Sequence, residues 1–144
     1  MILSTQNLFS DAQAITASAV SENILDFGAI EDPVHAVAGG RAGRQIGASD
    51  VEIFAQVVED FAALTSLEIE VQTAADEAFS SPTVTHRSGV VPAADLVAGK
   101  KFNLHRLAGD TGRYARLNYV VAGTNASAGK VTAGVIFADD SREV

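Results

Sequence analysis

The sequence contains no cysteine and no tryptophan, and only three of its 144 residues are proline. Without cysteine the chain has no disulfide framework, no thiolate nucleophile and no cysteine-ligated zinc or iron–sulfur cluster. Its apolar stretches break after a few residues, which excludes a membrane-spanning helix. The first basic residue is Arg41, so the start of the chain lacks the positively charged region of a secretion signal. We therefore expect a protein that acts inside a cell or within a particle.

The composition is that of a folded domain. Apolar residues make up 47% of the chain and charged residues 19%, which excludes intrinsic disorder. A chain of 144 residues has room for one domain with a sizeable core, and no internal repeat divides it. The sequence thus predicts a single domain over residues 1–144.

The charge of the chain is acidic overall but unevenly distributed. The net charge is −8, and so acidic a protein is poorly suited to hold a phosphate backbone, so we expect no nucleic-acid partner. Residues 45–86 carry eight acids and neither lysine nor arginine, whereas residues 87–130 carry seven bases against two acids, a net charge of +5. Two interpretations stay open. Either acidic and basic strands alternate and their fields cancel, or a two-signed surface orients docking.

Hydrophobic periodicity predicts strands and almost no helix. Residues 67–73 alternate between apolar side chains and Glu, Gln or Thr, which is typical of a strand with one covered face. Further strands are predicted over 51–61, 83–87, 101–107, 114–122 and 130–138, with short extended pieces around 17–19 and 24–27 and one helical turn over 92–99. This pattern predicts an all-β fold, a two-sheet antiparallel β-sandwich. We favour a jelly roll, because it accommodates a polar N-terminal arm (1–15) and one long Gly-rich loop (28–49).

No motif of catalysis or metal binding stands out. The Gly-rich run 39–47 fits neither the P-loop nor the dinucleotide fingerprint. The three histidines, His35, His86 and His105, are not clustered with further ligands, and no Gly-x-Ser-x-Gly elbow is present. Glu68 and Glu70 share the polar face of a strand and are expected to be solvated. The sequence predicts no enzyme, no metal and no cofactor.

Four segments give the chain a family likeness. They are residues 1–14, MILSTQNLFSDAQA; residues 66–74, SLEIEVQTA; residues 112–119, GRYARLNY; and residues 129–134, GKVTAG. In this order they resemble the capsid cement (decoration) proteins of tailed bacteriophages, of the short-tailed type. The resemblance implies a jelly roll on the outside of a phage head that bridges neighbouring major capsid proteins through electrostatic contacts and added β-strands. It further implies a virion protein that passes through the host cytoplasm during assembly, without enzymatic activity or membrane contact.

The resemblance also directs the choice of partner-binding residues. A polar arm can add a strand to a partner's sheet, so we expect contacts with the major capsid protein from Ser4, Thr5, Gln6, Asn7, Leu8 and Phe9. Basic contacts are expected from Arg41 and Arg44 in the long loop and from Arg113 and Arg116. We also expect a homo-oligomer, with a dimer favoured over a trimer. The alternative is a receptor- or carbohydrate-binding β-sandwich of a phage particle, for which an aromatic content of 6% offers few stacking platforms.

Overall fold

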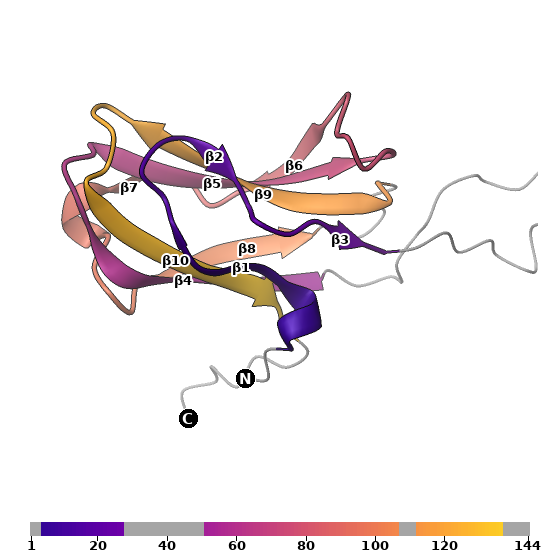
Figure 1. Ribbon diagram of the computed structural model, residues 1–144, viewed down its shortest axis with the longest axis horizontal. Coiled ribbons are helices and arrows are strands. Elements are labelled where there is room, and N and C mark those ends of the chain that lie inside the picture. The colour runs from indigo at the N-terminus through magenta and orange to yellow at the C-terminus, as the bar shows by residue number, and fades with distance from the viewer. Residues whose placement is uncertain (1–3, 28–50, 107–111, 137–144) are drawn as a thin grey trace, which may run out of the picture.

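The computed structural model describes residues 4–27, 51–106 and 112–136, and regular structure in them is almost entirely β (Figure 1). Two single turns of 3₁₀ helix accompany the strands, η1 (Thr5–Asn7) and η2 (Ala93–Asp95). The strands are β1 (Leu8–Ala14), β2 (Ala19–Val20), β3 (Leu25–Asp26), β4 (Val51–Ala62), β5 (Ser66–Ala74), β6 (Thr83–Arg87), β7 (Val91–Pro92), β8 (Lys101–Arg106), β9 (Tyr114–Ala122) and β10 (Ala128–Val135).

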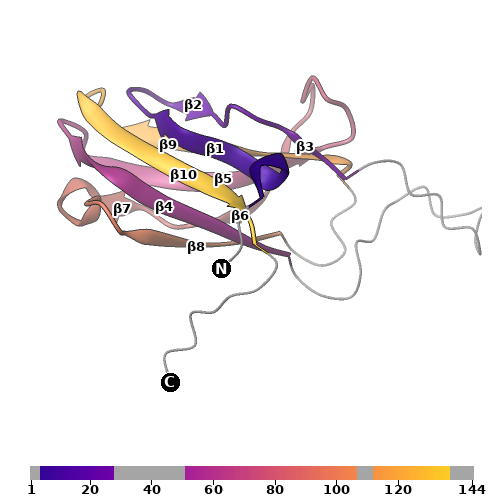
Figure 2. The ribbon, with the colours of Figure 1, turned by 60° about the horizontal axis from the view of Figure 1, so that its bottom comes forward.

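The strands form two antiparallel sheets that pack face to face (Figure 2). Sheet A has the order β1-β10-β4-β8, and sheet B has the order β2-β9-β5-β6. Two short strands pair with other parts of the central strands of sheet B. Strand β3 pairs with the start of β9, where β2 no longer reaches, and β7 pairs with the start of β5, where β6 no longer reaches. If each short strand is counted with its neighbour, eight strands remain, and successive strands alternate between the sheets for most of the chain. This is the double-sheet jelly roll predicted from the sequence, which is thereby confirmed.

The core lies between the two sheets and follows from the alternation of each central strand. Leu67, Ile69 and Val71 on β5 are fully buried, and they face apolar residues of sheet A. Val57 of β4 and Val131 of β10 lie opposite each other in register and are also fully buried. Each such aliphatic side chain contributes roughly 1.5–3 kcal/mol when it is removed from water. A period of two along β4, β5, β9 and β10 therefore suffices to build one continuous core.

The predicted free N-terminal arm is wrong for residues 8–15, because they belong to the sandwich. They form β1, which pairs with β10 at the edge of sheet A, and Phe9 and Ile15 are both fully buried. Two register shifts interrupt this pairing, and Ala12 adopts a positive φ of 49°. Such bulges interrupt the alternation of side chains between the two faces of the strand. The sequence therefore shows no strand periodicity here, although the apolar residues of the segment anchor it in the core.

The boundaries of most other elements agree with the sequence prediction. Strands β6 and β9 match the predicted ranges 83–87 and 114–122, and the helical turn appears as η2. β10 begins two residues before its predicted start. The predicted long loop 28–49, with Arg41 and Arg44, lies outside the described residues. Within the described ranges, no helix is both long enough and apolar enough to cross a membrane.

One glycine in β10 is required by the packing. Gly129 has a φ of +133°, a conformation that residues with a side chain rarely adopt. A Cβ placed at Gly129 would collide with the ring of Phe61, a buried residue near the end of β4. The glycine therefore lets β10 pass directly beside an aromatic side chain of the core.

Candidate partner-binding surfaces

The six predicted N-terminal contact residues are divided between the surface and the core. Ser4 caps η1, because its hydroxyl accepts a hydrogen bond from the backbone N–H of Gln6 at 3.4 Å. Thr5 and Gln6 are exposed, and Asn7 is half-buried. Phe9, in contrast, is fully buried, and Leu8 is half-buried in β1. Only residues 4–7 are therefore available for a partner without disturbing the sandwich.

Arg113 has a partner within the chain. Its guanidinium donates two hydrogen bonds to Asp26, from Nε to Oδ1 and from Nη2 to Oδ2, both at 2.8 Å. These bonds raise the pKa of Arg113 above its ordinary value. The guanidinium also lies 4.9 Å from the centre of the Tyr114 ring. Arg113 therefore fastens the short strand β3 to the start of β9, while the ion pair stays about 40% exposed.

Arg116 is held against the outer face of sheet B. Its Nε donates a hydrogen bond to Gln72 Oε1 at 2.9 Å, and its guanidinium carbon lies 4.2 Å from the centre of the Phe79 ring. Burial lowers the pKa of Arg116. Arg116 thus lies on β9 of sheet B and Arg113 directly precedes that strand, whereas residues 4–7 lead into sheet A. The structure does not gather these predicted residues into one site.

The acidic face of β5 is covered, contrary to the expectation of a solvated surface. Glu70 is only 7% exposed, and its carboxylate pairs with Arg87 of β6 at 2.9 Å and accepts a hydrogen bond from Asn118 of β9 at 2.9 Å. Glu68 lies 3.4 Å from the same Arg87 guanidinium. The physical reason is the position of β5 between β6 and β9, whose long polar side chains reach across it. With the Arg116–Gln72 bond, these contacts form a polar ladder across three strands.

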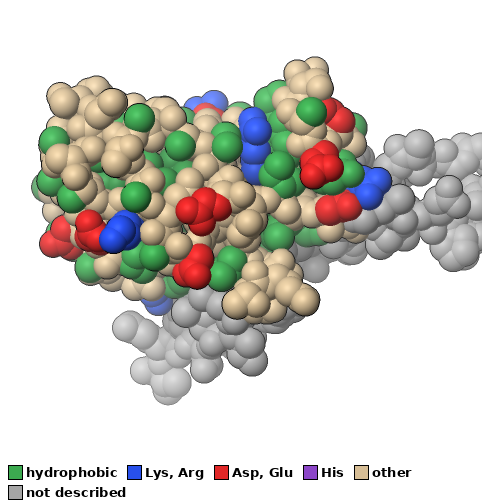
Figure 3. All heavy atoms as spheres, viewed as in Figure 1, with side chains coloured by type: hydrophobic (Ala, Val, Ile, Leu, Met, Phe, Trp, Pro, Cys, Tyr) green, Lys and Arg blue, Asp and Glu red, His purple; other side chains and the backbone are tan. Residues whose placement is uncertain are grey.

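Pairing across strands decides how the charge is distributed. Acidic β5 lies between β6 and β9, and acidic β4 lies between β8 and β10. Besides the pairs of the polar ladder, Lys130 on β10 contacts Glu59 on β4 at 2.6 Å. On the face that Figure 3 shows, acidic and basic side chains are interspersed rather than separated. Of the two interpretations that the sequence left open, the described ion pairs support alternation with cancelling fields.

A buried hydrogen-bond network joins β1 to the opposite sheet. The Ser10 hydroxyl donates to Gln13 Oε1 at 2.6 Å and lies 2.7 Å from the hydroxyl of Tyr119, which then acts as the donor to Ser10. Gln13 in turn donates to the carbonyl of Val20 in β2 at 2.9 Å. Burial of Tyr119 raises the pKa of its phenol, and the bond to Ser10 offsets only part of this rise. Sequence reasoning missed this network because its link to the opposite sheet, from Ser10 to Tyr119, joins residues 109 positions apart.

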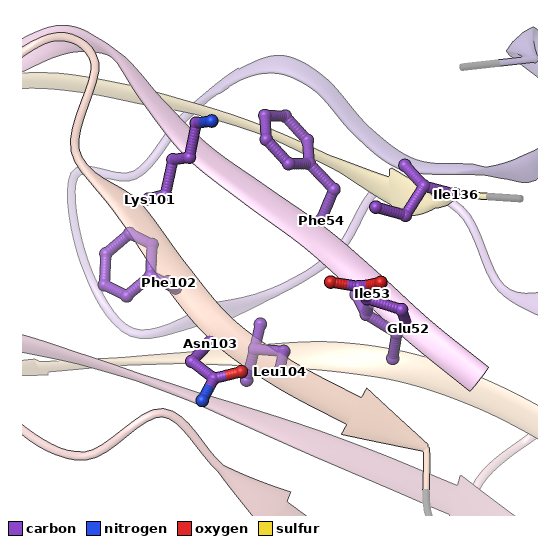
Figure 4. Close-up of a pocket in the computed structure, with 8 residues that line it drawn as sticks. All are labelled: Glu52, Ile53, Phe54, Lys101, Phe102, Asn103, Leu104 and Ile136. Carbon is purple, nitrogen blue, oxygen red and sulfur yellow. The ribbon is translucent and has the colours of Figure 1, made fainter. Parts of the chain in front are cut away.

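A shallow groove of about 220 Å³ lies over β4 and β8 of sheet A (Figure 4). Figure 4 shows the Phe54 ring between Lys101 and Ile136, and Glu52 and Asn103 also line the groove. The Lys101 ammonium is 5.9 Å from the centre of the Phe54 ring. Strands β4 and β8 supply these side chains together with Ile136, which directly follows β10, so no local sequence motif indicates the groove. Neither in this groove nor in the rest of the described part of the chain is a group of three or more His, Cys, Asp or Glu residues placed to hold a metal ion.

Comparison with known proteins yields one family. A family model described as Bbp16 matches residues 9–135. The match begins within β1 and ends with the last residue of β10, so it spans the jelly roll from its first strand to its last. No curated protein matches the chain.

Proposed function

The chain belongs to the Bbp16 family, and we propose that it is a virion structural protein that decorates the outside of a phage head. In this role it binds neighbouring major capsid proteins without covalent links and stabilises the shell by holding them together. It does so as a homo-oligomer, with a dimer favoured over a trimer, and it catalyses no reaction. The protein passes through the host cytoplasm before it joins the capsid exterior.

The observation that carries this proposal is where the resemblance falls in the fold. Residues 66–74 are β5, residues 112–119 include most of β9, and residues 129–134 lie within β10. These are central strands of the two sheets, so the likeness to cement proteins concerns the framework of the domain and not a peripheral segment. Jelly rolls occur in viral capsid proteins as well as in lectins and cupins, so the fold is compatible with this role.

The structure changes which surfaces we assign to the capsid. Strand β1 is not free to be donated, because it exchanges hydrogen bonds with Val20, Glu22 and Asn23. Among these, the Asn23 N–H donates to the Phe9 carbonyl at 2.9 Å. Residues 4–7 remain as one contact, and a strand contributed by the capsid would instead extend β6, where Thr83 and Val84 are exposed. Main-chain hydrogen bonds supply the affinity in such an arrangement, so it needs no special side-chain motif.

Co-sedimentation with expanded, undecorated heads of the cognate phage tests the proposal. Saturable binding that raises the thermal resistance of the heads supports the cement role, and light scattering on the free protein gives the oligomeric state. A variant that lacks residues 2–7 should fold normally and bind more weakly. Arg41→Gln with Arg44→Gln tests the long loop in the same assay, and its effect should shrink as salt screens the contact. Absence of binding to heads, together with binding to a glycan, would favour the receptor-binding alternative.

The exposed apolar side chains weigh against that alternative. Large hydrophobic residues exposed in the described ranges are all aliphatic: Val20, Ile24, Val58, Val84, Val90 and Val97. Carbohydrate sites generally stack sugars on aromatic rings, whereas aliphatic side chains suit contacts between proteins. The surface therefore fits a protein partner better than a glycan.

A further inference from the structure

Two histidines from opposite sheets meet at one side of the sandwich. His86 lies on β6, an edge strand of sheet B, and His105 lies on β8, an edge strand of sheet A. Their ring centres are 5.6 Å apart and their planes cross at 76°. Both side chains are half-buried. The pair is the only ring–ring contact between the sheets in the described residues, and it lies where the edges of the sandwich approach each other.

The nitrogen atoms of these rings are not used by the fold. Among the described residues, neither the His86 nor the His105 side chain has a hydrogen-bond or ion-pair partner, although both backbones are paired within their sheets. A neutral imidazole carries one N–H donor and one lone pair, and in these half-buried rings both remain open to water or to a ligand. Hydrophobic packing does not require histidine at either position. Two adjacent rings with available lone pairs are instead the arrangement that a shared cation would satisfy.

We propose that His86 and His105 form a two-histidine site for a divalent transition metal of the zinc, nickel and copper class. Imidazole suits these ions, and zinc binds each ring nitrogen at about 2.0–2.1 Å. Histidine χ2 is a broad torsion, so both rings can turn a nitrogen toward one point between them. Water completes the coordination, since no third protein ligand is clustered there in the described residues. The bound ion would join β6 to β8 and so link the two sheets at their edge.

Calorimetric titration of the chelator-treated full chain with zinc or nickel chloride tests the site. We expect one ion per chain, and a melting temperature raised by about 5–10 °C at a metal concentration roughly a hundredfold above the Kd. His86→Gln and His105→Gln should each abolish saturable binding. His35→Gln, which removes the third histidine of the chain, is the matched control and should bind as the unmodified protein does.

Nuclear magnetic resonance of the unmodified protein provides a test that does not depend on the variants folding. Adding zinc should shift the imidazole nitrogen resonances of His86 and His105 and leave those of His35 in place. The proposal is overturned if the unmodified chain binds no ion, if binding survives both substitutions, or if His35→Gln abolishes it. Because all these measurements use the isolated protein, their failure would leave the proposed capsid role untouched.

Discussion

Removing residues 2–12 should unfold the domain or bring it close to unfolding, because this deletion takes away most of β1. Phe9 is fully buried, and the loss of a buried phenylalanine side chain typically costs about 3–5 kcal/mol. The deletion also removes Ser10, which leaves the buried Tyr119 hydroxyl without its partner at a cost of about 1–3 kcal/mol. These losses are comparable with the whole free energy of unfolding of a typical domain, about 5–15 kcal/mol.

Urea unfolding followed by far-ultraviolet circular dichroism measures the effect. The deletion of residues 2–7 should change the free energy of unfolding by less than about 1 kcal/mol, since it spares the buried part of β1. Phe9→Ala should lower it by about 3–5 kcal/mol with an unchanged slope. Val97→Ala is the control, because Val97 is 50% exposed, and its change should stay within about 0.5 kcal/mol.

The reasoning is refuted by one clear result. If the 2–12 deletion and Phe9→Ala both unfold at the urea concentration that unfolds the full chain, β1 contributes nothing to stability. The segment would then be the dispensable arm that its polar sequence suggests.

Three further substitutions test the packing, the polar ladder and the buried phenol. Gly129→Ala should lower the melting temperature far more than Gly89→Ala, because both glycines have positive φ but only Gly129 meets an aromatic ring. Glu70→Ala should lower the free energy of unfolding in urea by about 1–3 kcal/mol, because Glu70 is buried. Lys130→Ala, which breaks an exposed ion pair, should lower it by only about 0–1 kcal/mol. Equal losses would contradict the role assigned to burial. Burial raises the pKa of Tyr119 above its ordinary 10.0. The contribution of Tyr119 to the free energy of unfolding is therefore complete below pH 10 and declines as the pH rises further. Above pH 10 the ionisable phenol should make the free energy of unfolding fall by up to about 1.4 kcal/mol per pH unit, and Tyr119→Phe should abolish this fall. Unfolding measured between pH 9 and 11 checks the difference.

Much of the fold is predictable from local patterns, whereas the candidate surfaces are not. Strand β9 and the alternation of β5 are visible in the chain because one face of each strand meets the core. The alternation of β5 does not reveal that its polar face is covered too, since that depends on which strands flank it. From the sequence, Arg113 and Arg116 are predicted to be available to a partner, yet both side chains form hydrogen bonds with residues of other strands. No local signal indicates those partners.

The N-terminal segment shows the same limit from the opposite direction. Residues 4–7 stay out of the core, as their polar composition suggests, but the buried side chains of Phe9 and Ile15 anchor the rest of the segment in the core. A bulged edge strand carries no clean period, so only the neighbouring strand β10 reveals that residues 8–14 belong to the sheet.

By itself, the sequence determined the all-β class, the positions of the long strands and the lack of cysteine chemistry. These properties depend on residue type and on the period of side chains along one strand. The tertiary structure alone decided that β1 is part of the core, that the acids of β5 are paired, and that His86 meets His105. Each of these results depends on contacts between residues far apart in the chain, and such contacts follow from the order of strands in the two sheets. Local periodicity fixes which face of a strand is apolar, but it does not fix which strand lies beside it.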